Sequence, residues 1–463
     1  MSISWQDLPG MRVTVMGLGL HGGGVASAFF FASHGATVTV TDLKDRSALG
    51  ASIERLAELP IRFELGHHCE TDFSQTDLVI KNPAVPQHSP FLGLSRSKGI
   101  AIETDLSVFL HLANNPLIAV TGSKGKSTIS TAIHHCLKDR HPQAKLGGNI
   151  TVSPLSFISG LEEQAPIVLE ISSWQLSDLR GKGVLKPRVS MISNILPDHL
   201  NKYANLQDYI EDKKVIFQTQ DPRSSFIFNF DDPHQKDFPL ATQAKAFAFS
   251  RHPLPHGVSG ACLTNGTGKI RMPGRDDIVV PEDVLLLGEH NRLNLLAAGL
   301  ALFLFGVEAA NIRAGLGAFA GIEHRLELFT SKRGIRFYND SAATIPQALV
   351  CALKSVPGPV NLIAGGADKK LDFAPLEEIM HLPDQVFLLA GSATEKMIPY
   401  FHKHKRPFHG PYDSLEAAVE SAVAATAPGA AVLLSPGCTS FEMFANEFER
   451  GLRFKELISA LSG

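Results

Sequence analysis

The sequence predicts a three-domain α/β protein built on mainly parallel β-sheets. The chain has 463 residues, which is more than one domain of ordinary size needs. Short apolar segments of strand length alternate with segments of helix length along the whole chain, and this pattern is typical of parallel sheets covered by helices. Two of the strand segments run directly into glycine-rich loops, and such loops at strand ends bind phosphates.

The first domain, residues 1–104, is expected to be Rossmann-like and to bind a nucleotide diphosphate. The strand Arg12–Met16 runs into Gly17–Gly22, whose glycines have the GxGxxG spacing, and Asp42 ends the next strand. Such a loop turns backbone N–H groups toward phosphates, and the acidic residue accepts a hydrogen bond from a ribose. The motif fits any nucleotide diphosphate and does not imply nicotinamide. A purely structural tight turn is the alternative.

The second domain, residues 105–321, is expected to resemble a P-loop ATPase with a mainly parallel sheet. The strand Leu117–Val120 leads into the loop Gly122–Thr128, and a helix-length segment follows. In such a loop Lys126 would reach the outer phosphates of a nucleotide, and the Ser127 hydroxyl would bind Mg²⁺. Only two residues separate the two glycines of this loop, so it is a shortened variant. A glycine turn that merely caps a helix is the alternative.

Further residues of the second domain are candidates for the same site. Glu170 directly follows an apolar strand, and a carboxylate in that place suits Mg²⁺, which prefers oxygen ligands. His199 follows another strand, where it would bind a metal, orient an acyl group or be purely structural. Lys213 and Lys214 lie on an expected helix, Leu206–Phe217, and the sequence by itself favours solvent exposure of both.

The third domain, residues 322–463, is expected to be a second Rossmann-like unit. Its apolar segments fall at residues 335–338, 360–364, 386–390 and 431–434, and each ends in small or polar residues. Ligands of open parallel sheets lie beyond the carboxyl ends of the strands. These strand ends are therefore where a further substrate is expected to bind.

Composition and charge exclude several other classes of protein. Hydrophobic residues make up 44% of the chain and charged residues 19%, as in folded globular proteins. Lys and Arg (43) do not outnumber Asp and Glu (46), so a broad basic surface for nucleic acid is not expected. The five cysteines form no CxxC pair, and the run Leu295–Val307 is shorter than the ~20 residues of a membrane span. Because the N-terminus also lacks a signal segment, we expect a cytoplasmic protein with reduced thiols and no membrane span.

Several motifs in a fixed order resemble the Mur ligases over nearly the whole chain. They are Gly122–Thr128, Gly147–Asn149, Glu170–Leu176, Asp198–His199, Tyr209–Lys213, Gly288–Asn294, His324–Arg325, Asn339–Ser341, Gly365–Gly366 and Leu434–Phe441. The chain is most similar to the members of the family that attach D-glutamate. The residues that favour those members are Gly17–Leu20, Asn82–Pro83 and Phe444–Asn446.

The resemblance implies an ATP-dependent ligase that forms an amide bond in the cytoplasmic synthesis of peptidoglycan precursors. ATP would phosphorylate the carboxylate of UDP-N-acetylmuramoyl-L-alanine, and the amine of D-glutamate would then displace phosphate from the acyl phosphate. Two Mg²⁺ ions are implied. The lysine that matches Lys213 is carbamylated in the family, a reaction that requires its neutral amine. We expect a monomer, because no heptad pattern or apolar stripe calls for a partner.

The resemblance also implies roles for individual residues. For the uridine nucleotide substrate these are Leu20, His21, Asp42, Asn82 and Asn149. For ATP they are Gly122, Ser123, Lys124, Gly125, Lys126, Ser127, Thr128, Asn291, Arg325 and Asp340, the last three matching positions that hold adenine, phosphate and ribose. For the incoming amino acid they are Thr344, Lys369, Ser440 and Phe448. The expected catalytic residues are Lys126, His199 and Lys213, and the expected metal ligands are Ser127, Glu170, His199 and Lys213.

Three positions depart from the family pattern and leave alternatives open. Lys124 stands where the family usually has Asn, Ala342 stands where it often has Lys, and Asn446–Phe448 carries one additional residue. The alternatives are a sister ligase that adds another amino acid, a folate-type polyglutamate ligase, a nicotinamide-dependent oxidoreductase and an inactive nucleotide-sugar-binding module. The N-terminal domain argues against the folate enzymes, and the oxidoreductase leaves the second phosphate loop and Glu170 unexplained.

Overall fold

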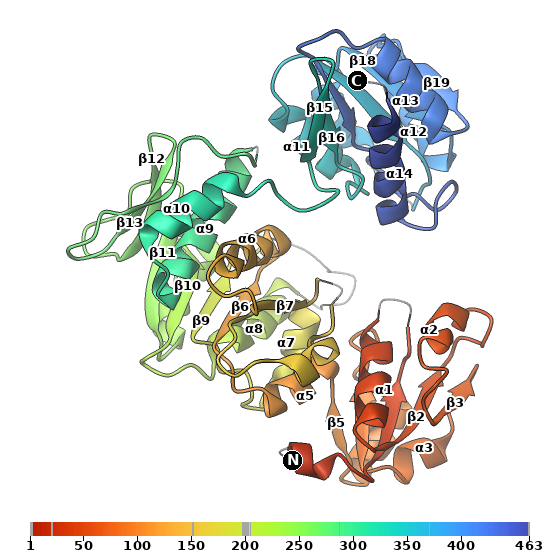
Figure 1. Cartoon of the computed structure of the whole chain (residues 1–463), viewed down its shortest axis with the longest axis vertical. Coiled ribbons are helices and arrows are strands. Elements are labelled where there is room, and N and C mark those ends of the chain that lie inside the picture. Colours follow the sequence, from red (N-terminus) through yellow and green to blue (C-terminus); the bar gives the residue numbers. More distant parts are fainter. Residues whose placement is uncertain are drawn as a thin grey trace. The chain divides into compact units, whose positions relative to one another are not determined.

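Three β-sheets with helices packed on them carry the fold (Figure 1). The computed structural model describes residues 3–19, 22–150, 152–196, 203, 205–286, 288–369 and 371–461. Contacts divide the chain into two compact units, of which one is Met1–Glu282 with Leu293–Leu316 and the other is Asp283–Arg292 with Gly317–Gly463. The prediction of an α/β fold with three mainly parallel sheets is confirmed.

The first sheet has five parallel strands in the order β3-β2-β1-β4-β5. The strands are β1 (Arg12–Met16), β2 (Thr37–Asp42), β3 (Ile61–Leu65), β4 (Leu78–Lys81) and β5 (Ala101–Glu103). The helices are α1 (Gly23–Ser33), α2 (Gly50–Glu54), α3 (Glu70–Ser74), α4 (Pro90–Ser97) and α5 (Asp105–Leu112). Val13 and Val15 share a core with α1 and α5, whereas Met16 and Val79 share one with α3 and α4. Helices therefore cover both faces, and the strand order reverses between β1 and β4, where open sheets bind ligands.

The second sheet has nine strands in the order β14-β13-β12-β11-β10-β9-β6-β8-β7. Strands β6 to β12 pair in parallel and β13 and β14 are antiparallel. The strands are β6 (Leu117–Thr121), β7 (Lys145–Gly148), β8 (Ile167–Glu170), β9 (Val189–Ile192), β10 (Ser225–Asn229), β11 (Lys245–Ser250), β12 (Gly260–Thr264), β13 (Thr267–Arg271) and β14 (Ile278–Val280).

The helices around the second sheet are α6 (Lys126–Lys138), α7 (Ser173–Leu179), α8 (Leu206–Lys214), α9 (Glu289–Phe305) and α10 (Ala309–Ala318). Most of the apolar run Leu295–Val307 lies in α9, where Leu295 and Leu302 are fully buried. The helix expected over Leu206–Phe217 is α-helical only to Lys214, and it ends in the 3₁₀ turn Val215–Phe217. Among the helices of the described residues, none combines the length and the apolar character that a membrane crossing needs.

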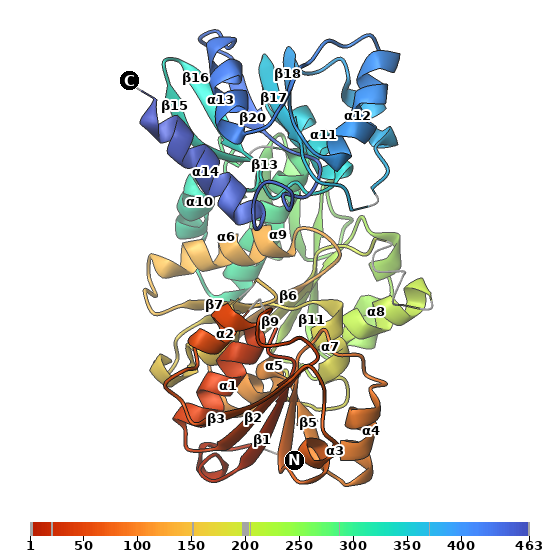
Figure 2. The same cartoon turned by 90° about the vertical axis from the view of Figure 1, so that its right-hand side faces the viewer.

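The third sheet has six strands in the order β15-β16-β20-β17-β18-β19, and only the pair β15–β16 is antiparallel. Its strands are β15 (Glu327–Lys332), β16 (Ile335–Asn339), β17 (Val360–Gly365), β18 (Gln385–Leu389), β19 (His409–Tyr412) and β20 (Ala431–Leu434). Its helices are α11 (Pro346–Ser355), α12 (Ser392–Lys403), α13 (Leu415–Ala424) and α14 (Glu447–Ala460), several of which Figure 2 shows around the strands. Leu433 packs with α11 and α12, whereas Val432 and Leu434 pack with α13 and α14. Successive side chains of a strand point to opposite faces of the sheet, so the two layers of helices pack on opposite faces of the third sheet.

Buried polar contacts join the first sheet to the second. Lys81 Nζ, at the end of β4, lies 2.9 Å from Asp178 Oδ2 on α7, and both side chains are 4% exposed. Burial raises the pKa of Asp178 even though the Lys81 ammonium opposes the shift. Lys182 Nζ lies 2.9 Å from Glu103 Oε1 at the end of β5. These pairs fix the two sheets against each other, because a charge taken out of water needs its partner.

Candidate functional site

The phosphate loop connects β6 to α6 and requires glycine at two positions. Gly122 has φ 145° and Gly125 has φ 85°, and both values lie in the region that favours glycine. A Cβ on Gly122 would overlap Ser193 Oγ, and a Cβ on Gly125 would lie 2.5 Å from Asn294 Oδ1. The backbone is therefore held close to β9 and α9. Because α6 begins at Lys126, its first N–H groups and partial positive charge are available to an anion at the loop.

The loop is held by neighbours that follow β9. The Lys124 N–H donates to Asn194 Oδ1 at 2.9 Å, and Ser193 Oγ donates to the Lys124 carbonyl at 2.6 Å. Lys126 Nζ donates to the carbonyl oxygens of Gly122 and Ser123, each at 3.0 Å. These bonds fix the backbone of the loop and bring the lysine amine over it. Ser193 and Asn194 were not predicted to support the loop, because their contact with it spans about seventy residues of chain.

Lys213 points into the same loop. Its side chain is 1% exposed, and Nζ donates to the Gly122 carbonyl at 2.9 Å. The amine also lies 4.4 Å from the centre of the Tyr209 ring, and the Tyr209 hydroxyl is 2.9 Å from Ser123 Oγ. Lys214, by contrast, forms an ion pair with Glu211 at the helix surface. The expectation that both lysines are solvent-exposed is wrong for Lys213, and the burial separates it from its neighbour.

Glu170 lies beside the loop at the end of β8. It pairs in register with Val120 of β6 on one side and Gly148 of β7 on the other. The side chain is 1% exposed. Oε1 accepts a hydrogen bond from Asn149 Nδ2 at 2.7 Å, whereas Oε2 is buried and has no hydrogen-bond partner in the described part of the chain. A buried carboxylate oxygen without a partner is costly.

This arrangement fits a divalent cation. Mg²⁺ prefers carboxylate and hydroxyl oxygens, and Ser127 lies in the first turn of α6, which follows the neighbouring strand β6. A cation would give Glu170 Oε2 the partner that it lacks. Asn149, which is expected at the uridine nucleotide, donates a hydrogen bond to Glu170, because β7 and β8 are adjacent strands. His199 lies outside the described residues.

A cavity of about 630 Å³ lies at the carboxyl end of the first sheet. Gly17, Gly19, Asp42 and Asn82 line it. Asp42 Oδ2 accepts a hydrogen bond from the Gly19 N–H at 3.2 Å, and Asn82 Nδ2 donates to the Gly17 carbonyl at 3.4 Å. The GxGxxG loop, the acidic residue and Asn82 are therefore brought together, although Leu20 and His21 lie outside the described residues.

The glycine that lets helix α1 approach the GxGxxG loop closely is Gly24, and not Gly22, the last glycine of that motif. A Cβ on Gly22 would meet nothing within 4 Å, whereas a Cβ on Gly24 would clash with the carbonyl oxygens of Gly17 and Leu18. His68 also lines the cavity, and its Nδ1 lies 2.6 Å from Thr41 Oγ1. Burial lowers the pKa of His68, so it is a neutral hydrogen-bonding group that sequence patterns did not single out.

Asp340 lies at the carboxyl end of β16 in the third sheet. Its side chain is 8% exposed, and its oxygens accept hydrogen bonds from Ser435 Oγ at 2.7 Å and the Leu326 N–H at 2.9 Å. Burial raises the pKa of Asp340 to about 7, although both hydrogen bonds oppose the shift. The hydrogen bond from the Leu326 N–H brings the preceding residue, Arg325, close to Asp340.

A buried arginine that the sequence did not reveal ties this edge of the third sheet together. Arg450 is 1% exposed and donates from Nε to Ser341 Oγ at 3.0 Å and from Nη2 to the Cys438 carbonyl at 3.4 Å. Burial lowers the pKa of Arg450 to about 10. It therefore links the loop after β16 to the loop after β20. Ser440, in the second loop, has a buried Oγ without a hydrogen-bond partner among the described residues.

The remaining candidates of the third sheet are less enclosed. Thr344 is half-buried and Lys369 is exposed. Phe448, in the first turn of α14, is 49% exposed and its ring centre lies 6.0 Å from that of His324. Arg325 is exposed, whereas Asn291, in the first turn of α9, is buried. The exposed side chains of Lys369, Arg325 and Phe448 are accessible to a ligand.

The three-sheet fold and the loop with its carboxylate define a nucleotide-binding α/β enzyme of the phosphate-loop class. The profile of the Mur ligase middle domain matches residues 120–302. The UDP-N-acetylmuramoylalanine–D-glutamate ligase of Roseiflexus sp. (strain RS-1) is 39% identical over 466 residues, which cover 98% of this chain and 100% of that protein. The enzyme of the same name from Treponema pallidum (strain Nichols) is 36% identical, covering 97% of this chain and 98% of the relative. The chain therefore belongs to the Mur ligase family, whose members are ATP- and Mg²⁺-dependent amide-bond-forming ligases.

Solved structures of the family share the fold at lower sequence identity. The UDP-N-acetylmuramate–alanine ligase from Thermotoga maritima superposes with a TM-score of 0.60 at 19% identity and covers 98% of this chain and 100% of that one. MurF from Acinetobacter baumannii gives a TM-score of 0.58 at 16% identity, with 92% and 90% covered. At these identities the likeness establishes the fold alone.

Proposed function

We propose that the protein joins D-glutamate to UDP-N-acetylmuramoyl-L-alanine at the expense of ATP, through an acyl-phosphate intermediate. The observation that carries the proposal is the meeting of three features at one sheet edge: the Gly122–Thr128 loop, the buried Lys213 amine and the partnerless oxygen of Glu170. The relatives named for this reaction match the chain from end to end. The oxidoreductase and the inactive binding module leave this second site without a purpose.

Each domain has a separate role in the proposal. Residues 1–104 bind the uridine nucleotide, and the cavity with Asp42 and Asn82 supports this role. Residues 105–321 bind ATP on the loop and α6. Residues 322–463 bind the incoming amino acid beyond the ends of β16, β17 and β20. Asn291, Arg325 and Asp340 are assigned to the adenosine and phosphate of ATP, and the buried Asp340 carboxyl suits a ribose hydroxyl.

The proposed reaction has two steps. A carboxylate oxygen of UDP-N-acetylmuramoyl-L-alanine attacks the γ-phosphorus of ATP, the bond to ADP breaks, and an acyl phosphate forms. The amine of D-glutamate then attacks the acyl carbon, loses a proton, and phosphate leaves as the amide forms. Lys126 and the first N–H groups of α6 hold the negative charge that develops on the transferred phosphoryl group.

Mg²⁺ would be held by Ser127 and Glu170, and in a second site by His199 and the carbamylated Lys213. A bound Mg²⁺ supplies positive charge to the phosphoryl oxygens. The environment of Lys213 supports the modification, because its amine is buried against Tyr209 and faces the loop. The modification forms on the neutral amine, which is the form that reacts with carbon dioxide. Two metal ions and a carbamylated lysine are thus part of the proposal.

The amino-acid site is proposed beyond the third sheet, with Thr344, Lys369, Ser440 and Phe448 around the substrate. Ser440 Oγ is buried without a partner in the described residues, so it is available to a substrate carboxylate. Lys369 is exposed and offers a positive charge to the same dianion. Arg450 links the loop after β16, which carries Thr344, to the loop after β20, which carries Ser440. Ala342 supplies no charge here, and a sister ligase for another amino acid is the second candidate for that reason.

We infer a monomer that works in the cytoplasm, where nucleotide-linked precursors are made. The first test is release of phosphate from ATP by the purified protein with UDP-N-acetylmuramoyl-L-alanine and one of D-glutamate, L-glutamate, L-lysine or diaminopimelate. Release is expected only when the nucleotide substrate and D-glutamate are both present. Lys126→Ala is expected to abolish it, whereas Lys138→Ala, at the other end of α6, is the matched control. Release with another amino acid would favour the sister ligase, and no release with any of them would overturn the proposal.

A further inference from the structure

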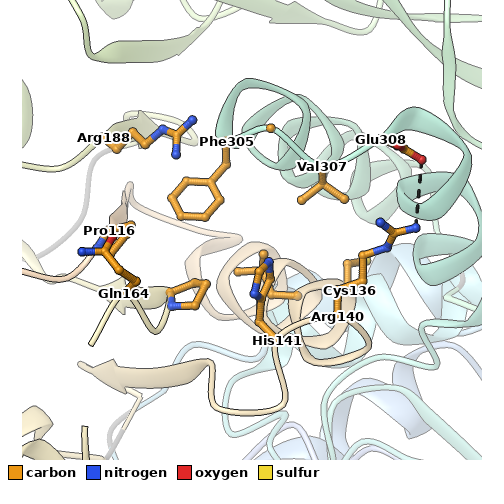
Figure 3. Close-up of a pocket in the computed structure, with 12 residues that line it drawn as sticks. Pro116, Cys136, Arg140, His141, Gln164, Arg188, Phe305, Val307 and Glu308 are labelled. Atoms are coloured by element: carbon orange, nitrogen blue, oxygen red, sulfur yellow. Dashed lines mark ion pairs between the residues drawn. The ribbon is translucent and has the colours of Figure 1, made fainter. Parts of the chain in front are cut away.

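A second cavity lies at the edge of the central sheet opposite to the phosphate loop (Figure 3). Pro116, Pro166 and Arg188 line it and stand immediately before β6, β8 and β9. This wall is therefore the amino end of the same strands whose carboxyl ends meet at the loop. The cavity has a volume of about 280 Å³, close to the lower end of the range of ligand pockets. It is suited to a small molecule.

The opposite wall is formed by the far ends of two helices. Leu137 lies in the last turn of α6 and Phe305 is the last residue of α9, and both are buried apolar side chains of the cavity. Gly306, with φ 104°, turns the chain from α9 toward α10. A Cβ on Gly306 would stand 3.7 Å from Arg188 Nη2. The absence of a side chain here leaves room beside the guanidinium.

The guanidinium of Arg188 is held in place by its neighbours but has no carboxylate partner among the described residues. Its central carbon lies 5.0 Å from the centre of the Phe305 ring, and the backbone of Arg188 is fixed by 2.9 Å hydrogen bonds to Leu117 and Ser225. Across the described ranges of the chain it has no carboxylate partner and no side-chain hydrogen bond. Its N–H donors are therefore open to a ligand, on a side chain that the aromatic ring already orders.

A second guanidinium shares the cavity. Arg140 Nη2 lies 4.0 Å from Glu308 Oε2, and the two side chains are 56% and 75% exposed, so this pair holds the arginine only weakly. Figure 3 shows Arg140 and His141 on the side of the cavity opposite to Arg188. Glu308 is the one acidic residue in the lining. The lining therefore contains two guanidinium groups and an imidazole but one exposed carboxylate. This excess of positive charge favours binding of an anion.

The cavity is connected to the phosphate loop by rigid elements. α6 begins at the loop lysine, Lys126, and ends at the cavity, and its length is about 20 Å. α9 touches the loop through Asn294, beside Gly125, and ends at Phe305. A ligand that moves the far end of either helix therefore acts on an element that also shapes the loop.

We propose that this cavity is a second ligand site, which takes a small metabolite carrying a phosphate or carboxylate group. The anionic group pairs with Arg188, Arg140 adds positive charge on the opposite side of the cavity, and the rest of the ligand lies against Phe305 and the two prolines. The site is remote from the substrates of the proposed reaction and does not depend on that reaction being correct.

The test is equilibrium dialysis of the full-length protein against radiolabelled inorganic phosphate. A non-hydrolysable ATP analogue with Mg²⁺ is present at saturation to fill the phosphate loop. Saturable phosphate binding is expected, and Arg188→Gln is expected to weaken it at least about tenfold. Arg223→Gln is the matched control, because Arg223 is exposed and pairs with Asp221. Succinate as competitor distinguishes the ligand classes: displacement assigns the site to carboxylates as well, and no displacement assigns it to phosphates.

Absence of saturable binding, or equal binding by Arg188→Gln and the unaltered protein, would overturn the proposal. Binding that Lys126→Ala removes but Arg188→Gln leaves belongs to the phosphate loop and has the same consequence. Arg188 is exposed, so its substitution is not expected to impair folding, which circular dichroism and the thermal midpoint verify. Arg140→Gln provides a second variant on the opposite wall and is expected to weaken binding in the same direction.

Discussion

The buried carboxyl of Asp340 makes the stability of the second compact unit depend on pH. Burial raises the pKa of Asp340 from 3.8 to about 7. Between these values the folded protein keeps a proton that the unfolded chain has released, so stability falls as the pH rises through this window. The loss is about 1.4 kcal/mol per pH unit, or about 4 kcal/mol over the whole window.

Replacing Asp340 by Asn removes this loss. The amide oxygen still accepts from the Leu326 N–H, and the amide nitrogen donates to Ser435 Oγ, so both hydrogen bonds have a counterpart. The free energy of unfolding of Asp340→Asn, relative to that of the unaltered protein, is expected to be about 3 kcal/mol higher at pH 8 than at pH 5. For a unit of this size the gain corresponds to roughly 10 °C in the thermal midpoint. Affinity for ATP is expected to fall in the same variant.

The assay is scanning calorimetry of both proteins at pH 5 and pH 8. All other titrating groups are common to the two proteins. The change in their stability difference between pH 5 and pH 8 therefore reports the contribution of Asp340. Ser435→Ala serves as a control that removes a hydrogen bond of Asp340 but leaves its carboxyl. An equal stability difference at pH 5 and pH 8 would refute the argument that burial governs this carboxyl.

Three further perturbations test the compact unit formed by Met1–Glu282 and Leu293–Leu316. Because Lys213 is proposed as a metal ligand, Lys213→Met is expected to lower turnover about a hundredfold. Lys214→Met is expected to leave turnover within about threefold, because its ion pair with Glu211 is superficial. Glu170→Gln is expected to raise the Mg²⁺ concentration for half-maximal turnover at least about tenfold, measured by Mg²⁺ titration. Lys81→Met removes the ion-pair partner of the buried Asp178 and is expected to destabilise the unit by about 3–5 kcal/mol in thermal unfolding, with recovery when Asp178→Leu is added.

Each expectation has an outcome that contradicts it. Equal turnover of the two lysine variants would mean that burial of Lys213 serves packing only. An unchanged Mg²⁺ requirement after Glu170→Gln would remove that carboxylate from the metal site. A Lys81→Met protein as stable as the unaltered one would show that the Lys81–Asp178 pair is not what fixes the first sheet to the second.

The strand ends were predictable because the signals for them are local. Segments such as Arg12–Met16, Val189–Ile192 and Ala431–Leu434 are apolar, short and followed by glycine or polar residues, and the structure forms strands with those bounds. Parallel pairing then brings their carboxyl ends to one edge. The sequence therefore predicts that Glu170 and the loop after β6 lie at the same sheet edge, and the parallel pairing of β6 with β8 places them there.

Contacts between distant segments were not predictable from local patterns. Lys213 and Lys214 are adjacent and chemically identical, and only the rotation of α8 decides which of them is buried. Arg450 lies about one hundred residues from Ser341, which it supports, and no spacing rule links the two. Asn149 turns to Glu170 because β7 pairs with β8. Family resemblance marked Lys213 and Asn149 as important, but it does not supply their contacts.

The central claim is tested most directly by following oxygen from the substrate carboxylate into phosphate. UDP-N-acetylmuramoyl-L-alanine labelled with ¹⁸O in its free carboxylate is incubated with ATP, Mg²⁺, D-glutamate and the protein, and phosphate and nucleotide product are analysed by mass spectrometry. An acyl-phosphate route predicts one ¹⁸O atom in each phosphate released and a nucleotide product extended by one glutamate. Unlabelled phosphate, or labelled phosphate without the glutamate-containing product, would contradict the proposed ligase reaction.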